Sequence, residues 1–228
     1  MDQLPRMLLE ISTWIIPALL AITLHEAAHG FVADRLGDPT ARLAGRLSLN
    51  PFRHIDPFGT VLLPGLLLLM HSPFLFGYAK PVPVNFRQLR HPRRDMALVA
   101  AAGPLTNLAI AIVAALLIRP AEALPYDAYR WVFANLFNAI QLNVILAVFN
   151  LLPIPPLDGG RVLVAILPPS LARPLASLER LGIVIVLLFL FLIPRLGSQF
   201  GLNLPIDRWL VAGPVEAVRN AILGLAGF

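Results

Sequence analysis

The residues best suited to chemistry stand together in the stretch His25-Glu26-Ala27-Ala28-His29. On a helix, residues four apart share one face, so both imidazoles can bind the same metal ion. Glu26 directly follows the first histidine and can reach a water activated by that metal. This is the H-E-x-x-H pattern, which is typical of zinc-dependent hydrolases. The alternative is two unrelated histidines in a helix interface, although ionisable groups inside an apolar helix are costly and usually functional.

A zinc site in a hydrolase needs three protein ligands and one open position. The chain has no cysteine, so the third ligand must be His, Asp or Glu. Asp158 is a candidate, because it follows a proline-rich stretch at 153–156 and precedes Gly159 and Gly160. The prolines end a helix, and the glycines permit close backbone approach. Taken alone, Asp158 is also compatible with an ordinary aspartate at a helix end.

The elements that must position these residues are membrane helices. The chain has 228 residues, of which 57% are apolar and 14% charged, and its mean hydropathy is +0.75. Soluble domains average about 45–50% apolar and about 25% charged residues. A soluble globular enzyme and a disordered chain are therefore both excluded. The formal net charge is +5, and the basic residues are spread over loops, which indicates membrane topology rather than nucleic-acid binding.

Apolar stretches of about 20 residues predict membrane-spanning helices. Spans are expected at residues 7–32, 96–118, 131–152, 181–196 and 209–228. The last of these is also compatible with an amphipathic helix in the membrane interface. Residues 58–76 are apolar but contain Pro64-Gly65, which favours a re-entrant hairpin over a full span. The expected fold is an all-α polytopic membrane protein with about five to six transmembrane helices, a re-entrant hairpin and short membrane-associated β-strands.

Basic loops predict the orientation. The segments 33–57 and 77–95 are rich in arginine and are expected in the cytoplasm by the positive-inside rule. This places His29 and the end of the span near Leu152 on the cytoplasmic side. Extended stretches at 40–49 and 78–84 are candidate edges on which an unwound substrate segment could pair as an added strand. The alternative for both is an ordinary basic loop.

Several motifs together resemble the site-2 protease family of intramembrane zinc metalloproteases, in a compact bacterial branch without PDZ or CBS domains. They are H-E-A-A-H at 25–29, G-P-L-T-N at 103–107 and N-L-L-P-I-P-P-L-D-G at 150–159, with further likeness at 50–57 and 77–84. The resemblance implies that His25, His29 and Asp158 bind one zinc ion and that Glu26 is the catalytic acid–base. It implies that Asn150 holds substrate or stabilises the oxyanion. Ala28 stands where many members have glycine, a change that a helix tolerates.

The resemblance also implies the activity: an endopeptidase that cuts single-span membrane proteins within or near their transmembrane segments, in regulated intramembrane proteolysis. Residues 1–228 are expected to form a single intramembrane metalloprotease domain in a cell membrane, a bacterial inner membrane, with the active site toward the cytoplasm. The expected partners are these substrates and the lipid bilayer, and the oligomeric state is open. Two alternatives remain: a metal transporter that uses the same ligands, and a catalytically inactive membrane scaffold.

The remaining polar residues each allow two interpretations. His54 either supports the site or braces its loop, while His71 and His91 are expected to be structural or solvated. Asn107 either supports the site from the next helix or bonds a neighbouring helix, as buried amides in membranes often do. For the same reason, the polar residues of the following span are expected to bridge helices: Asn135, Asn138, Gln141 and Asn143.

Overall fold

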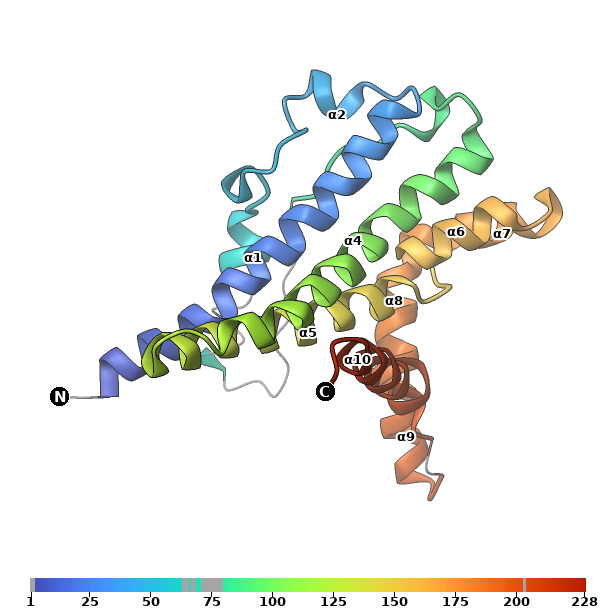
Figure 1. Cartoon of the computed structure of the whole chain (residues 1–228). Coiled ribbons are helices and arrows are strands. Elements are labelled where there is room, and N and C mark those ends of the chain that lie inside the picture. Colours follow the sequence, from blue (N-terminus) through green and yellow to red (C-terminus); the bar gives the residue numbers. More distant parts are fainter. Residues whose placement is uncertain (1–2, 63–65, 67–68, 71–79, 203) are drawn as a thin grey trace.

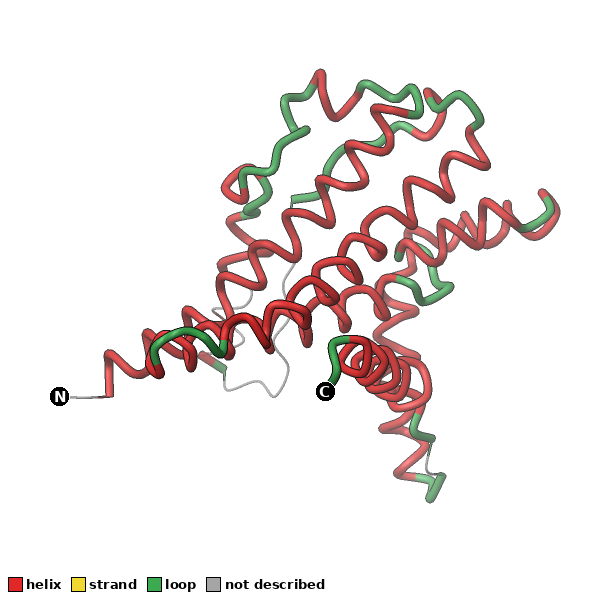
Figure 2. The backbone as a smooth tube through the Cα atoms, viewed as in Figure 1, coloured by secondary structure: helices red, strands yellow, loops and turns green. Residues whose placement is uncertain are grey.

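The computed structural model describes residues 3–62, 66, 69–70, 80–202 and 204–228. These residues are mostly helical and contain no β-strand (Figure 2). The short β-strands expected from the sequence are therefore not confirmed in the described part of the chain. The hairpin expected at 58–76 lies largely outside it, as does His71; the described start of that stretch belongs to a helical turn at Pro57–Leu62.

Three long helices form the framework of the fold (Figure 1): α1 at Gln3–Arg35, α4 at Pro92–Ala121 and α5 at Tyr126–Asn150. Each of them contacts the other two. By length and composition all three can cross a membrane, over Leu8–Arg35, Pro92–Ala121 and Tyr126–Asn150. They correspond to the spans predicted at 7–32, 96–118 and 131–152.

Small side chains let α4 lie close to its neighbours. Ala111 and Ala115 of α4 are almost completely buried and belong to the same core cluster as Val144 of α5. In lipid, close packing of this kind drives helix association, because there is no water to release. Polar groups add to it: the Asn138 amide of α5 donates to the Thr13 carbonyl of α1 over 3.0 Å. The predicted bridging by Asn138 is confirmed.

The chain after α5 is divided into shorter helices. They are α6 (Asp158–Ile166), α7 (Pro169–Ser177), α8 (Gly182–Leu187), α9 (Ile193–Gln199) and α10 (Gly213–Leu225). Wider helical turns at Leu188–Leu192 and Arg208–Ala212 change the helical geometry within the stretches predicted as spans at 181–196 and 209–228. Of the described residues, three helices meet the length and hydropathy of a span. The expected count of five to six is therefore not confirmed.

The residues that directly follow α1 and those that directly precede α4 lie at one end of the bundle (Figure 1). They include α2 at Thr40–Leu43. The prediction of an extended stretch at 40–49 is wrong for these four residues. The reason is local: the Asp38 carboxylate accepts a hydrogen bond from the Thr40 N–H over 3.0 Å and starts a turn. In the other candidate edge, residues 80–84 form a loop, and residues 78 and 79 lie outside the described part.

Candidate metal centre

Two imidazoles of α1 face α4 in the interior of the bundle. His25 and His29 are 8% and 9% exposed, and their ring nitrogens Nε2 lie 3.1 Å apart. Their spacing of four residues puts both rings on one helix face, as the sequence predicts. The first two candidate ligands are thus brought together by a single helix.

The third candidate ligand arrives from a distant part of the chain. Asp158 is the first residue of α6 and is buried. Gly159 and Gly160 allow α6 to rest directly on the preceding loop: a Cβ on Gly159 would lie 2.1 Å from the Leu151 carbonyl oxygen, and one on Gly160 would lie 2.3 Å from the Pro155 nitrogen. No side chain fits at either position, so the close backbone approach predicted for these glycines is confirmed.

The three ligand atoms form a nearly regular triangle. Asp158 Oδ2 lies 3.2 Å from His25 Nε2 and 3.3 Å from His29 Nε2, and the two nitrogens complete the triangle at 3.1 Å. With bonds of about 2.0–2.1 Å, a tetrahedral zinc ion needs ligand atoms roughly 3.3 Å apart. The observed edges therefore match three corners of such a site, and the fourth corner is left for water or substrate.

The outer nitrogens of both rings explain why a cation belongs in this triangle. His25 Nδ1 lies 2.5 Å from Asn107 Oδ1, and His29 Nδ1 lies 2.7 Å from the Val99 carbonyl oxygen. Both partners are acceptors, so each Nδ1 carries the proton and each Nε2 presents a lone pair. Three electron-rich atoms then face one another, and among the described residues Asp158 Oδ2 finds no hydrogen-bond donor. A bound cation removes this conflict.

The charge of Asp158 fits the same role. The start of α6 favours a negative charge, because backbone N–H groups are exposed there. The ligand set is thus two neutral imidazoles and one carboxylate, a combination that suits zinc.

Glu26 lies beside the two histidines on α1, but its carboxylate bonds another part of the chain. Its carboxylate oxygen Oε2 accepts a hydrogen bond from the backbone N–H of Val82 over 2.9 Å. Among the described residues, Val82 is the hydrogen-bond partner of the Glu26 carboxylate, and the bond leaves the other oxygen, Oε1, out of this contact. Glu26 is half-buried, unlike the ligands, so it stands at the border of the site.

Comparisons with known proteins agree with this geometry. The sequence model of peptidase family M50 matches residues 121–193, which include Asp158. Putative zinc metalloprotease YwhC of Bacillus subtilis is 41% identical over 188 residues, which are 81% of this chain and 81% of the relative. The chain belongs to peptidase family M50, the site-2 proteases. Putative zinc metalloprotease Rip2 of Mycobacterium tuberculosis is 37% identical over 184 residues, 80% of this chain and 67% of the relative. No solved structure gave a significant match.

Family membership, three long apolar helices and a buried ligand triangle together make this M50 chain a membrane metalloprotease. Zinc, the metal expected from the sequence, agrees with the family and with the His, His, Asp ligand set.

The amide of Asn107 fulfils both of the roles considered for it. While its oxygen accepts from His25, its nitrogen donates to Asn143 Oδ1 of α5 over 2.7 Å, and both side chains are fully buried. Asn143 in turn donates to the Ala139 carbonyl of its own helix. A chain of amides therefore runs from α5 through α4 to the first ligand of this site-2 protease, and the predicted bridging by Asn143 is confirmed.

Gly103 is a site residue whose function the sequence did not reveal. It lies in α4 against the ligands: a Cβ here would come within 2.5 Å of His29 Nε2 and 2.6 Å of His25 Nε2. Any side chain would occupy the space that the ligand atoms need. A glycine inside an apolar helix is the available signal, since it commonly marks a close approach. The Val99 carbonyl and the Val82 N–H have no such signal, because they are backbone groups of a kind that occurs along the whole chain.

The side-chain hydrogen bonds found for Asn150 and His54 go to backbone carbonyls and not to the three residues of the triangle. The Asn150 amide donates to the Leu146 carbonyl of its own helix, so its predicted part in catalysis stays a prediction. His54 is almost completely buried, and its Nε2 lies 2.8 Å from the Ser48 carbonyl oxygen. His54 is therefore a brace of its loop, the second of the two interpretations considered for it.

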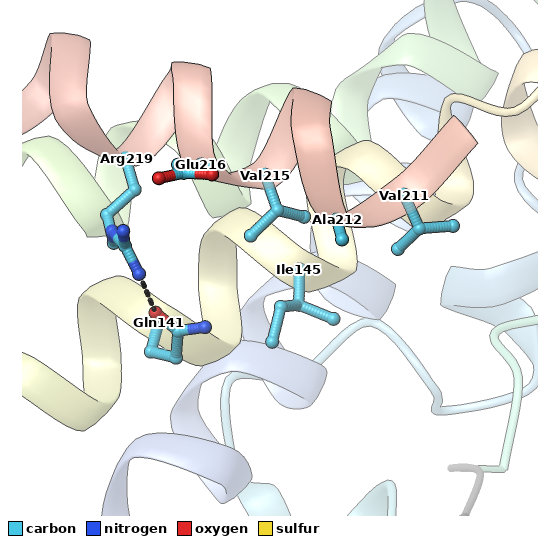
Figure 3. Close-up of a pocket in the computed structure, with 7 residues that line it drawn as sticks. All are labelled: Gln141, Ile145, Val211, Ala212, Val215, Glu216 and Arg219. Atoms are coloured by element: carbon cyan, nitrogen blue, oxygen red, sulfur yellow. Dashed lines mark hydrogen bonds between the residues drawn. The ribbon is translucent and has the colours of Figure 1, made fainter. Parts of the chain in front are cut away.

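A hollow between α5 and α10 lies on another side of α5 (Figure 3). Arg219 of α10 donates to Gln141 Oε1 of α5 over 3.4 Å across it, and Ile145 and Val215 add apolar walls. The polar pair ties the last helix to the bundle. Gln141 thus bridges two helices, as the sequence predicts.

Proposed function

We propose that this chain is an intramembrane zinc endopeptidase that hydrolyses peptide bonds within or near the transmembrane segments of membrane proteins. The observation that carries the proposal is the triangle of His25, His29 and Asp158, buried among three helices long enough to span a membrane. Residues 1–228 are treated as one metalloprotease domain. The substrates we propose are single-span proteins that reach the site from the lipid bilayer.

In this proposal His25, His29 and Asp158 hold the metal. When bound, zinc supplies a Lewis acid that acidifies water and polarises a carbonyl group. Glu26 accepts a proton from the attacking water as the water oxygen bonds to the scissile carbonyl carbon. When the C–N bond breaks, Glu26 returns that proton to the leaving amine. Asn150 is our candidate for holding the substrate or the oxyanion.

The substrate must unwind before it can be cut, because a transmembrane helix keeps its peptide groups in its own hydrogen bonds. Helix-breaking residues in a substrate's span are therefore expected to speed cleavage. We place the protein in a cell membrane, a bacterial inner membrane, with the site toward the cytoplasm. The arginine-rich loops at the end of α1 nearer the ligands support this orientation.

The test is zinc content and cleavage in detergent-purified protein. Wild type and Glu26→Gln are expected to hold about one zinc per chain, and His25→Ala and Asp158→Ala to lose it. Wild type alone should cleave a single-span peptide whose apolar segment contains a Gly-Ser break and is flanked by a fluorophore and a quencher. Zinc without cleavage of any such peptide would favour a transporter or scaffold, and zinc that survives Asp158→Ala would refute the three-ligand site.

A further inference from the structure

The Glu26–Val82 contact joins the α1 helix to a segment far away in sequence. We call residues 80–85, with the sequence Lys-Pro-Val-Pro-Val-Asn, the strap. Pro81 and Pro83 have no N–H group. The Val82 N–H is thus the single backbone donor between positions 81 and 83, and it goes to the Glu26 carboxylate. A shift of this contact by one residue in either direction would place a proline, which has no donor, opposite Glu26.

Both ends of the strap are fixed by other parts of the protein. At its start, the Lys80 N–H donates to the His54 carbonyl over 2.9 Å, and the Arg46 guanidinium donates to the Lys80 carbonyl over 2.9 Å. At its end, the Asn85 N–H donates 2.6 Å to the carboxylate of Asp38, which is fully buried. The strap therefore holds the Val82 N–H from both sides.

A glycine on α1 lets the strap come close enough to reach Glu26. Gly30 lies four residues after Glu26 and hence on the same helix face. A Cβ on Gly30 would come within 2.8 Å of Val82 Cγ1 and 3.1 Å of Leu47 Cδ1. The Val82 side chain is buried in the space that Gly30 leaves open. This seat sets the distance between the strap and the carboxylate.

We infer that Val82 is a positioning residue: its backbone N–H holds Glu26 Oε2 so that Oε1 is aimed at the reacting water. Gly30 and the anchored strap set the position of this donor. The inference rests on the proposed function for the chemistry that Glu26 performs, but the contact itself is independent of that function. It also follows that the inner edge of the strap offers a substrate no free N–H between residues 81 and 83.

The first test measures the contact without any substrate. Hydrogen exchange of the zinc-loaded protein is followed by mass spectrometry in a peptide that includes residues 80–85. Glu26→Ala removes the acceptor and is expected to speed exchange of the Val82 amide about tenfold or more. Glu26→Gln keeps an oxygen acceptor and is expected to retain most of the protection. Val82 exchange that is equally fast in wild type and Glu26→Ala would overturn the inference.

The second test removes the donor. Val82→Pro deletes the N–H at a position that already precedes a proline and is therefore biased toward extended conformations. We expect zinc to stay bound, kcat on the fluorophore–quencher peptide to fall about tenfold or more, and KM to change little. Val82→Ala keeps the N–H and is expected to keep most of kcat. A rise in kcat for Val82→Pro would mean that the strap inhibits Glu26, and would overturn the inference.

A third pair of variants tests whether the close packing of Val82 against Gly30 sets the position of the strap. Gly30→Ala pushes against Val82 Cγ1 and is expected to lower kcat, while Gly30→Ala combined with Val82→Ala removes the clashing methyl and is expected to restore much of it. The double variant failing to recover any activity would count against the seat. If wild type cleaves nothing, the proposed function fails, while the exchange experiment still decides whether Val82 holds Glu26.

Discussion

At the scale of single residues, the site depends on which nitrogen of each imidazole carries a proton. Acceptors on α4 take the Nδ1–H of both rings and leave both Nε2 lone pairs directed at Asp158. Only one of these acceptors is a side chain, Asn107. A side-chain substitution can therefore remove the acceptor of His25, whereas the acceptor of His29 is a backbone carbonyl that a substitution leaves in place.

Asn107→Leu keeps the approximate volume of the side chain but removes the acceptor for His25. Zinc affinity is expected to fall about 10–100-fold, the usual cost of losing an outer partner of a metal ligand. Competition with a chelator measures it. Asn138→Leu is the matched control, since Asn138 bonds Thr13 and no ligand. Equal zinc affinity in Asn107→Leu and wild type would contradict the role given to Asn107.

Gly103→Ala is expected to abolish zinc binding, because its methyl group would lie 2.5–2.6 Å from ligand nitrogens of rings that are already fixed by hydrogen bonds to α4. Metal analysis of the purified protein measures this. Gly224→Ala in α10 is the control, since a Cβ there meets nothing within 4 Å. A full zinc complement in Gly103→Ala would show that α4 can move away from α1.

Glu26→Gln is expected to keep zinc and lower kcat by about 10²–10⁴-fold, the range of general acid–base catalysis. Glutamine preserves the side chain's shape and an oxygen for Val82 but cannot take a proton from water. Turnover of the fluorophore–quencher peptide measures the change. Wild-type turnover in this variant would remove Glu26 from the chemistry.

At the scale of elements, the α5–α6 loop is the part that aims Asp158. Glycines pack against this loop from two sides. Gly159 and Gly160 of α6 rest on it from one side, and Gly182 at the start of α8 lies against it from the other. A Cβ added to Gly182 would lie 1.8 Å from the Pro155 carbonyl oxygen. Gly182 is far from every motif, and nothing in the sequence distinguishes it from a glycine that merely starts a helix.

Gly182→Ala is expected to displace this loop and weaken zinc binding, with a lower melting temperature, although Gly182 touches no ligand. Isothermal titration with zinc and thermal unfolding measure the two effects, and Gly224→Ala again serves as the control. If melting temperature falls while zinc affinity stays constant, α8 supports the fold without aiming Asp158.

The elements also show what the sequence can and cannot predict. Long apolar runs predicted α1, α4 and α5, and helical spacing predicted that His25 and His29 share a face. The prediction of an extended stretch at 40–49 was wrong at Thr40–Leu43, because the hydrogen bond from the Thr40 N–H to Asp38 starts a helical turn there. This one contact outweighs the weak preference of these residues for extended backbone. The breaks at Leu188–Leu192 and Arg208–Ala212 are invisible to hydropathy, which counts apolar residues and not hydrogen-bond registers. Backbone partners such as Val82 appear only once the chain is folded.

At the scale of the whole molecule, the candidate metal site joins parts of the chain that are 129 or more residues apart, His29 and Asp158. A ligand that binds only the folded state stabilises it by mass action. Removal of zinc with a chelator is therefore expected to lower the melting temperature of wild type by several degrees, and to leave His25→Ala unchanged. An equal shift in both proteins would mean that the chelator acts elsewhere.

The distance between the ligands has a consequence for synthesis of the protein. When the ribosome has made the first 150 residues, the H-E-x-x-H helix, its α4 braces and the strap already exist, but the anionic ligand does not. Asp158 follows only after α5 has been made. If the proposed function holds, a nascent or truncated chain that lacks Asp158 is expected to hydrolyse nothing, and activity is expected to begin only when this last ligand has been translated and folded into place.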